Sequence, residues 1–132
     1  MKILGQNTAK VKQPLHILLV EDNPINVKLA MINLQRLGHK IDVANNGQIA
    51  VNKYKENTYD LILMDIEMPI MDGIEATKLI RALENQNNLK SKVRIVAMTA
   101  HDVGHKDKLL NIGMDNYFCK PIRASNFVEI FA

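Results

Sequence analysis

Short and mostly apolar segments recur along the chain, and this pattern restricts its fold more than any other feature of the sequence. Each segment is too short for a stable helix and lacks the regular polar alternation of a strand with one exposed face. Such segments are typical of strands that are buried on both faces of a parallel sheet. The expected strands are residues 15–20, 40–44, 61–64, 93–98 and 117–119.

A segment with helical signals follows each expected strand. The first begins with Asn23, a favoured N-cap residue, and Pro24, which suits the first helical position, and it ends at Gly38. Another helix should open at 72–73 and end before a polar loop at 85–88. The remaining expected helices are residues 47–56, residues 102–112 and a short fifth helix from about 124.

The first helix carries apolar residues at helical spacing over one broad face, which we expect to pack on the sheet. These residues are Ile25, Leu29, Ala30, Ile32, Leu34 and Leu37. Strands that alternate with helices in this way form right-handed crossovers and a parallel sheet. The sequence therefore predicts an α/β fold, a doubly wound five-stranded parallel sheet with helices on both faces, over residues 15–132. Residues 1–14 are polar and are expected to be a leader or linker.

Composition and charge argue against several functions. The formal net charge is +3, but the Lys and Arg residues are scattered, so direct nucleic-acid binding is not expected. Contact with a membrane is not expected either, because no apolar stretch is long enough to cross a bilayer. The single cysteine, Cys119, cannot form an intramolecular disulfide, which favours a cytoplasmic location. Its place within a strand favours an inert, buried thiol.

Polar residues follow four of the five expected strands. Glu21 and Asp22 come after the first strand, Asp65 after the third, Thr99 after the fourth and Lys120 after the fifth. In a doubly wound sheet the carboxyl ends of the strands lie along one edge, where such proteins bind their ligands. Each of these residues alone has a simpler explanation as a turn, cap or surface residue. Their occurrence at one edge favours a chemical role.

Three carboxylates that lie close together raise one another's pKa values, so they need a counter-charge. A divalent cation such as Mg²⁺ prefers oxygen ligands and keeps water molecules that a phosphate can replace. With the ammonium of Lys120 and the hydroxyl of Thr99, such a metal would stabilise a phosphoryl group during transfer to a carboxylate. The residues therefore predict a phosphoryl-transfer site.

Four motifs at these positions resemble those of the receiver domains of response regulators in two-component systems. They are Glu21-Asp22-Asn23, Met64 to Gly73 (MDIEMPIMDG), Met98-Thr99-Ala100 and Lys120-Pro121. They occur in the family's order and spacing, and the central motif is most similar to receivers attached to hybrid sensor histidine kinases. The resemblance implies the flavodoxin-like strand order 2-1-3-4-5. The expected fifth helix, from about Ala124, departs from the family's pattern because it is shorter than usual.

The resemblance also implies a role for each acidic residue of the motifs. Asp65 would be the phosphoacceptor, which receives its phosphoryl group from a phosphohistidine donor. Mg²⁺ would be bound by Asp22, by Asp65 and by the backbone carbonyl of Glu67, with Glu21 assisting.

The other motif residues would sense the phosphoryl group. Thr99 would donate a hydrogen bond to it, and Lys120 would pair with its charge. Tyr117 matches the family's aromatic switch position, whose rotamer follows the state of Thr99, so that phosphorylation changes an interaction surface. The peptide bond between Lys120 and Pro121 would be cis.

The implied partner is a histidine kinase or a histidine phosphotransfer protein. The domain would catalyse its own phosphorylation and dephosphorylation rather than turn over an external substrate. A phosphorylation-dependent dimer, and attachment to a hybrid histidine kinase, remain open at this point. Two alternatives are an aspartyl-phosphate phosphohydrolase of the haloacid dehalogenase type and a receiver that only binds partners. The first would need an Asp-x-Asp pattern, which Glu21-Asp22 does not provide, and the second usually lacks one of the key residues.

Overall fold

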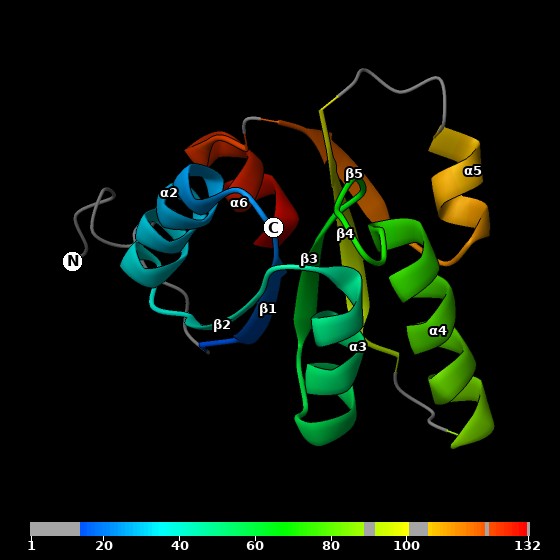
Figure 1. Cartoon of the computed structure of the whole chain (residues 1–132). Coiled ribbons are helices and arrows are strands. Elements are labelled where there is room, and N and C mark those ends of the chain that lie inside the picture. The colour runs from blue at the N-terminus through cyan, green and yellow to red at the C-terminus, as the bar shows by residue number, and fades with distance from the viewer. Residues whose placement is uncertain (1–13, 89–91, 101–105, 121, 132) are drawn as a thin grey trace.

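Five parallel strands form one sheet in the order β2-β1-β3-β4-β5 (Figure 1). The computed structural model describes residues 14–88, 92–100, 106–120 and 122–131. The strands are β1 (His16–Val20), β2 (Lys40–Ala44), β3 (Leu61–Asp65), β4 (Arg94–Thr99) and β5 (Asn116–Cys119). The predicted doubly wound α/β fold and its strand order are confirmed.

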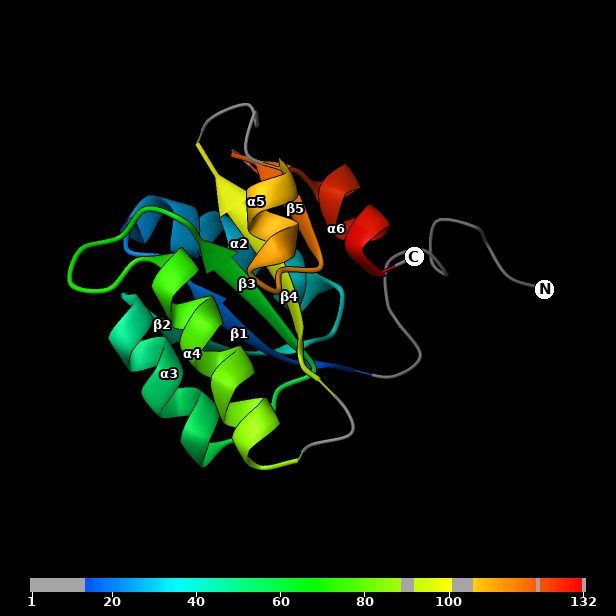
Figure 2. The same ribbon diagram turned by 90° about the vertical axis from the view of Figure 1, so that its right-hand side faces the viewer.

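Helices cover both faces of the sheet (Figure 2). The helices are α2 (Pro24–Arg36), α3 (Gly47–Glu56), α4 (Gly73–Gln86), α5 (Lys106–Asn111) and α6 (Ala124–Phe131). Apolar side chains of α2 and α6 pack on one face, and those of α3, α4 and α5 pack on the other. The last helix, α6, has 8 residues and is short, as expected.

Alternate residues of the central strands supply two hydrophobic cores, one on each face. Leu18 and Ile62 are paired neighbours in β1 and β3, and both belong to the core beneath α3, α4 and α5. Their chain neighbours Leu19 and Leu63 belong to the core beneath α2 and α6. Both faces of β1 and β3 are therefore buried, which explains why these strands are mostly apolar.

The first helix, α2, is capped as predicted but buries a different stripe of residues. The side-chain oxygen of Asn23 accepts hydrogen bonds from the backbone N–H groups of Ile25 and Asn26. The expected apolar face is wrong in part, because Ile25, Leu29 and Ile32 are 70%, 51% and 45% exposed. The helix instead packs on the sheet through a neighbouring stripe of residues, which follow one another at the spacing i, i+3, i+4, i+7. That stripe consists of Val27, Ala30, Met31 and Leu34.

The polar loop predicted at 85–88 is shorter, because α4 continues through Gln86. The expectation of a buried thiol is wrong, since the side chain of Cys119 is exposed at the end of the edge strand β5, while the preceding Phe118 faces the core. Residues 1–13, and residues 102–105 at the start of the expected fourth helix, lie outside the described residues.

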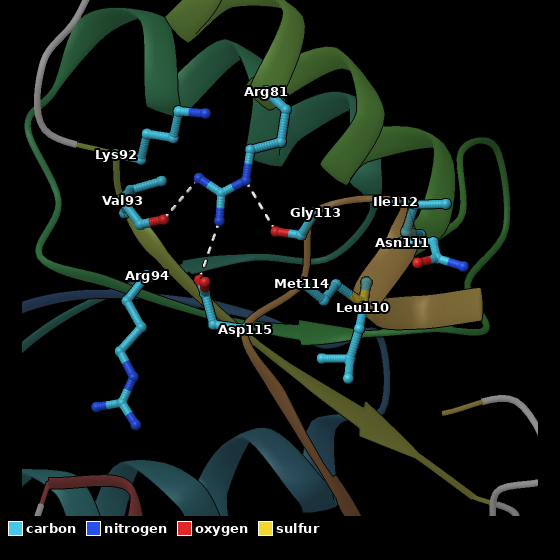
Figure 3. A pocket seen from close by; sticks show the side chains of 10 residues that line it. All are labelled: Arg81, Lys92, Val93, Arg94, Leu110, Asn111, Ile112, Gly113, Met114 and Asp115. Atoms are coloured by element: carbon cyan, nitrogen blue, oxygen red, sulfur yellow. Dashed lines mark hydrogen bonds and ion pairs between the residues drawn. The ribbon is translucent and has the colours of Figure 1, made fainter. Parts of the chain in front are cut away.

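The amino end of the sheet is held by the guanidinium of Arg81 on α4 (Figure 3). It donates hydrogen bonds to the carbonyls of Gly113 (2.8 Å) and Val93 (2.7 Å) and forms ion pairs with Glu84 (2.8 Å) and Asp115 (3.0 Å). The buried Glu84 carboxylate also accepts from the Val93 N–H at 2.7 Å. This network ties α4 to β4 and to the turn before β5, at the end of the molecule opposite the predicted site.

Candidate functional site

Three acidic residues meet at the carboxyl end of the sheet. Asp65 is the last residue of β3, and Glu21 and Asp22 directly follow β1. Glu21 and Asp65 are each 2% exposed, whereas Asp22 is exposed. One carboxylate oxygen from each of the three lies within 4.8 Å of the others. The structure thus brings together the acids that the sequence placed at one edge.

Lys120 lies between the two buried acids. It follows β5, and its Nζ lies 2.9 Å from Glu21 Oε1 and 2.9 Å from Asp65 Oδ2. Its backbone N–H donates to the carbonyl of Thr99 at 2.7 Å, which fixes the start of the segment after β5. One ammonium therefore neutralises part of the charge of both carboxylates.

The environment sets the ionisation of this pair. Burial raises the pKa of Asp65 to about 6, and the nearby Glu21 charge raises it too, while Lys120 and the Glu67 N–H oppose the rise. Burial alone would lower the pKa of Lys120, but its hydrogen bonds to Glu21 and Asp65 outweigh that cost and raise it. At neutral pH Asp65 is therefore mainly a carboxylate, as a nucleophile must be, and Lys120 is an ammonium.

Two glycines allow close packing at the two ends of the loop that follows Asp65. A Cβ atom at Gly73 would lie 2.1 Å from the Asp65 carbonyl oxygen, and one at Gly47 would lie 2.5 Å from the Met71 carbonyl oxygen. The Gly73 N–H donates to the carbonyl of Ile66 at 3.0 Å, so the end of the loop after β3 is hydrogen-bonded to its start. Asp72 does not join the acidic cluster, because it caps α4 by accepting from the Glu75 N–H at 2.8 Å.

The remaining predicted residues lie on β4, on β5 and in the loop after β3. Thr99 is the last residue of β4 and is 8% exposed. Tyr117 lies on the neighbouring strand β5, paired with Ala97, and is half-buried against the core beneath α3, α4 and α5. The backbone N–H of the exposed Glu67 donates to Asp65 Oδ1 at 3.2 Å. The expected cis bond before Pro121 lies outside the described residues.

Cavity size does not single out the acidic cluster. A cavity lined by Glu21 and Lys120 measures only about 30 Å³. Larger cavities of about 520 and 620 Å³ lie at the amino end of the sheet, the first of them beside Arg81 (Figure 3). Those cavities hold no comparable group of metal ligands among the described residues. The clustered acids, and not the cavity volumes, therefore mark the candidate site.

Residues 17–132 match the family model of the response regulator receiver domain. The chain therefore belongs to the receiver domain family of two-component systems. Among curated proteins, it is 48% identical over 121 residues to hybrid signal transduction histidine kinase B of Dictyostelium discoideum, covering 85% of this chain and 6% of that protein. The chain spans between 6% and 15% of the length of the first curated relatives that it matches.

Solved structures show the same fold. One is the receiver domain of the Saccharomyces cerevisiae response regulator Ssk1, in a co-crystal with the histidine phosphotransfer signaling protein Ypd1. It is 36% identical with a TM-score of 0.86, covering 91% of this chain and 88% of that one. Another is the receiver domain of a Pseudomonas aeruginosa sensor histidine kinase with a magnesium ion in its active site cleft. It is 37% identical with a TM-score of 0.77, covering 89% and 94%.

None of the helices in the described part of the chain is long and apolar enough to span a bilayer. The burial of Glu21 and Asp65 at the carboxyl end of the sheet bears on the stability of the fold.

Replacing Asp65 with Asn should stabilise the metal-free protein at pH 8 by on the order of 1 kcal/mol. The pKa of Asp65 in the folded state, about 6, lies above its ordinary value of 3.8. This carboxyl therefore favours folding below about pH 4, and the benefit is lost as the pH rises through 6. The advantage of Asp65→Asn should accordingly shrink as the pH falls from 7 to 4.

Thermal and urea unfolding in a chelator, at several pH values, measures this effect. Asp22→Asn is the matched control, because Asp22 belongs to the same cluster but is exposed and should change stability little. A lower stability of Asp65→Asn at pH 8, or an advantage that grows with acidity, would contradict the assignment of a destabilised buried carboxylate.

Proposed function

We propose that this chain accepts a phosphoryl group from a phosphohistidine on the side chain of Asp65, as the receiver of a two-component phosphorelay. The observation that carries the proposal is the position of Asp65, a buried carboxylate 2.9 Å from the ammonium of Lys120 at the carboxyl end of the sheet. The family assignment supports the same conclusion. Residues 15–132 would form the receiver, with residues 1–14 as its leader or linker.

In the transfer step, a carboxylate oxygen of Asp65 forms a bond to phosphorus while the bond from phosphorus to the donor imidazole nitrogen breaks. The imidazole leaves with the electron pair of that bond. Such a transition state carries negative charge on the phosphoryl oxygens, so positioned positive charge and hydrogen-bond donors accelerate the reaction. Lys120 supplies an ammonium beside Asp65, and Thr99 supplies a hydroxyl at the neighbouring strand end.

The donor set fits Mg²⁺, the cofactor expected from the sequence. Asp22, Asp65 and the backbone carbonyl of Glu67 would hold the ion, with Glu21 assisting, because hard cations prefer such oxygen ligands. The clustering of the three carboxylates supports this assignment, as does the magnesium ion in the similar Pseudomonas aeruginosa receiver. When bound, Mg²⁺ supplies positive charge that offsets the clustered carboxylates and the incoming phosphoryl group.

The proposed donor is a histidine kinase or a histidine phosphotransfer protein. The complex of the yeast receiver with Ypd1 and the similarity to hybrid histidine kinases support this class of partner. A protein-bound phosphohistidine would approach Asp65 from the side of Asp22, the exposed member of the acidic cluster. Direct binding of nucleic acid is not proposed. A phosphorylation-dependent dimer would require that phosphorylation change the surface of the domain.

Phosphorylation would change the surface through Thr99 and Tyr117. A phosphoryl group on Asp65 offers the Thr99 hydroxyl a charged acceptor, and it offers Lys120 a new ion partner. A shift of Thr99 toward Asp65 leaves space beside β4, and the half-buried ring of Tyr117 lies on the adjacent strand. Rotation of that ring inward would alter the surface formed by α5, β5 and α6.

Incubation with a small phosphodonor and Mg²⁺ should add one phosphoryl group, detected by intact mass spectrometry. Asp65→Asn should abolish the adduct, and Lys120→Met should slow its formation by roughly 10²-fold or more, as for the loss of one group that stabilises transition-state charge. Asp60→Asn, at the amino end of β3, is a matched control that should be labelled normally. An adduct of equal size on Asp65→Asn would disprove the proposed phosphoacceptor, and turnover of external phosphoesters would favour a hydrolase.

Replacing Thr99 with Ala should uncouple the surface change from phosphoacceptance, because a ligand shifts a conformational equilibrium only through differential contacts. In the wild type, beryllofluoride on Asp65, which stands in for the phosphoryl group, should shift the NMR signals of Tyr117 and α5. In Thr99→Ala beryllofluoride should still bind, but those shifts should shrink. Unchanged Tyr117 signals in the wild type would rule out the switch and leave the phosphoacceptor proposal standing.

A further inference from the structure

The histidine at the start of β1 lies between two hydrogen-bond acceptors. His16 Nδ1 is 3.0 Å from the carbonyl oxygen of Thr58, and Nε2 is 2.9 Å from Asp42 Oδ2. Thr58 belongs to the segment before β3, and Asp42 lies on β2. His16 is the first residue of β1, at the end of the sheet opposite the acidic cluster, so the proposed phosphoryl transfer makes no use of it.

Neither partner of the His16 ring can donate a hydrogen bond. A peptide carbonyl only accepts, and so does an ionised carboxylate. The hydrogen bond that Tyr59 donates to the same Asp42 Oδ2, at 2.7 Å, lowers the pKa of Asp42, and the contact with His16 lowers it further, although burial raises it. Burial and the hydrogen bond to Asp42 raise the pKa of Tyr59. At neutral pH Asp42 is therefore a carboxylate and Tyr59 is a phenol.

The number of protons on the imidazole decides whether both contacts can form. A neutral imidazole has one N–H, so the lone pair of its other nitrogen would face the second acceptor. The doubly protonated ring donates to both. Turning the ring over would place carbon atoms at both positions, and the ring of Tyr59 packs against it with 4.5 Å between centroids. The geometry therefore fits His16 with two ring protons.

These contacts hold a strand that has a neighbour on one side only. β2 is an edge strand of the sheet (Figure 1). The side chain of Asp42 links it to β1 through His16 and to the segment before β3 through Tyr59. At the other end of β2, the carbonyl of Ala44 accepts from the N–H of Glu21 at 3.0 Å. The strand is thus also hydrogen-bonded to the segment that carries the acidic cluster.

We propose that His16 and Asp42 form a pH-sensitive attachment of β2, which is complete when His16 carries both ring protons and loses one contact when His16 loses one proton. Histidine changes its charge within the physiological pH range. Protonation favours the attached strand, so the contribution of His16 to local stability is present at low pH and is lost as the pH rises. This inference does not depend on the proposed function of Asp65.

Several other titratable groups lie close enough to affect the same measurement. The carboxylate of Asp60 accepts from the backbone N–H of His16 at 2.8 Å. The charged groups of neighbouring elements are Lys40 on β2 and Lys53 and Glu56 on α3. All of them, and the distant Asp65, are present in the wild type and in a His16 variant alike. A comparison of the two proteins at each pH therefore cancels their own titration.

The second histidine at this end of the sheet has an effect of opposite sign. His39 Nδ1 accepts from the N–H of Leu15 at 3.0 Å, and burial lowers the pKa of His39. Protonation of Nδ1 would remove this acceptor, so the contribution of His39 to stability is lost as the pH falls. Its titration cannot imitate that of His16.

The test measures backbone hydrogen exchange of the β2 amides at pH 6 and pH 8, relative to an unstructured peptide at the same pH. His16→Gln carries no charge at any pH. Asp42→Asn offers either its oxygen or its NH₂ group, so it suits both protonation states of His16. Asp60→Asn is the matched control, because this carboxylate contacts the backbone of His16 rather than its ring.

At pH 6 the β2 amides should be protected about fivefold more in the wild type than in His16→Gln, the effect of one partly exposed charged contact. At pH 8 the difference should fall below about twofold. Asp42→Asn should differ from the wild type in the same pH-dependent way, whereas the ratio for Asp60→Asn should be equal at both pH values. In the wild type, NMR signals of the Asp42 carboxyl and the Tyr59 ring should shift with the same midpoint as the His16 ring nitrogens.

A ratio of wild type to His16→Gln that is equal at pH 6 and pH 8 would overturn the inference. So would signals of Asp42 and Tyr59 that do not follow the titration of His16, an outcome that needs no variant and holds even if a substitution prevents folding. A pH-dependent ratio for Asp60→Asn, with a constant ratio for Asp42→Asn, would assign the effect to Asp60 and refute the role of Asp42.

Discussion

The site depends on one ammonium group that two buried carboxylates share. Two neighbouring carboxylates with 2% exposure would be strongly unfavourable without a cation and hydrogen bonds to compensate them. Lys120 provides that cation from the end of β5, reaching past β4 to Asp65 on β3 and to Glu21 after β1. The strand order β2-β1-β3-β4-β5 brings these strand ends within reach of one lysine side chain. The compensation of the two buried carboxylates therefore depends on the topology of the sheet.

The site is assembled at some cost to the fold. Burial raises the pKa of Asp65 to about 6, so the carboxylate that the proposed phosphoryl transfer requires is disfavoured in the folded state near neutral pH. The loop after β3 needs Gly73, because any Cβ there would collide with the Asp65 carbonyl, and it tolerates Ile70 in a strained turn. Such costs are expected where a fold carries a reactive site. At the other end, the Arg81 network and the apolar cores stabilise the sheet.

The sequence predicted the sheet and the position of the acidic cluster because both follow from simple patterns. Apolar strands that each end in a polar residue place Glu21, Asp22 and Asp65 at one edge, and the structure brings them together. The sequence could not predict which apolar stripe of α2 faces the sheet, because Ile25 and Ala30 both belong to apolar repeats at helical spacing. Which of the two repeats is buried depends on the packing of the helix against the sheet. The exposure of Cys119 and the strained turn at Ile70 likewise depend on three-dimensional neighbours, although the MDG motif could have drawn attention to Gly73.

The claim that Lys120 stabilises the buried carboxylates can be tested by measuring the pKa of Asp65 in the metal-free protein. The ¹³C NMR signal of its side-chain carboxyl carbon, followed as a function of pH, reports this pKa. We predict a pKa of about 6 in the wild type, because burial and Glu21 outweigh the attraction of Lys120. In Lys120→Met the pKa should be higher still, because the cation that favours the carboxylate is gone. A wild-type pKa near the ordinary value of 3.8, or no increase in Lys120→Met, would contradict the account of a buried acid pair held by one lysine.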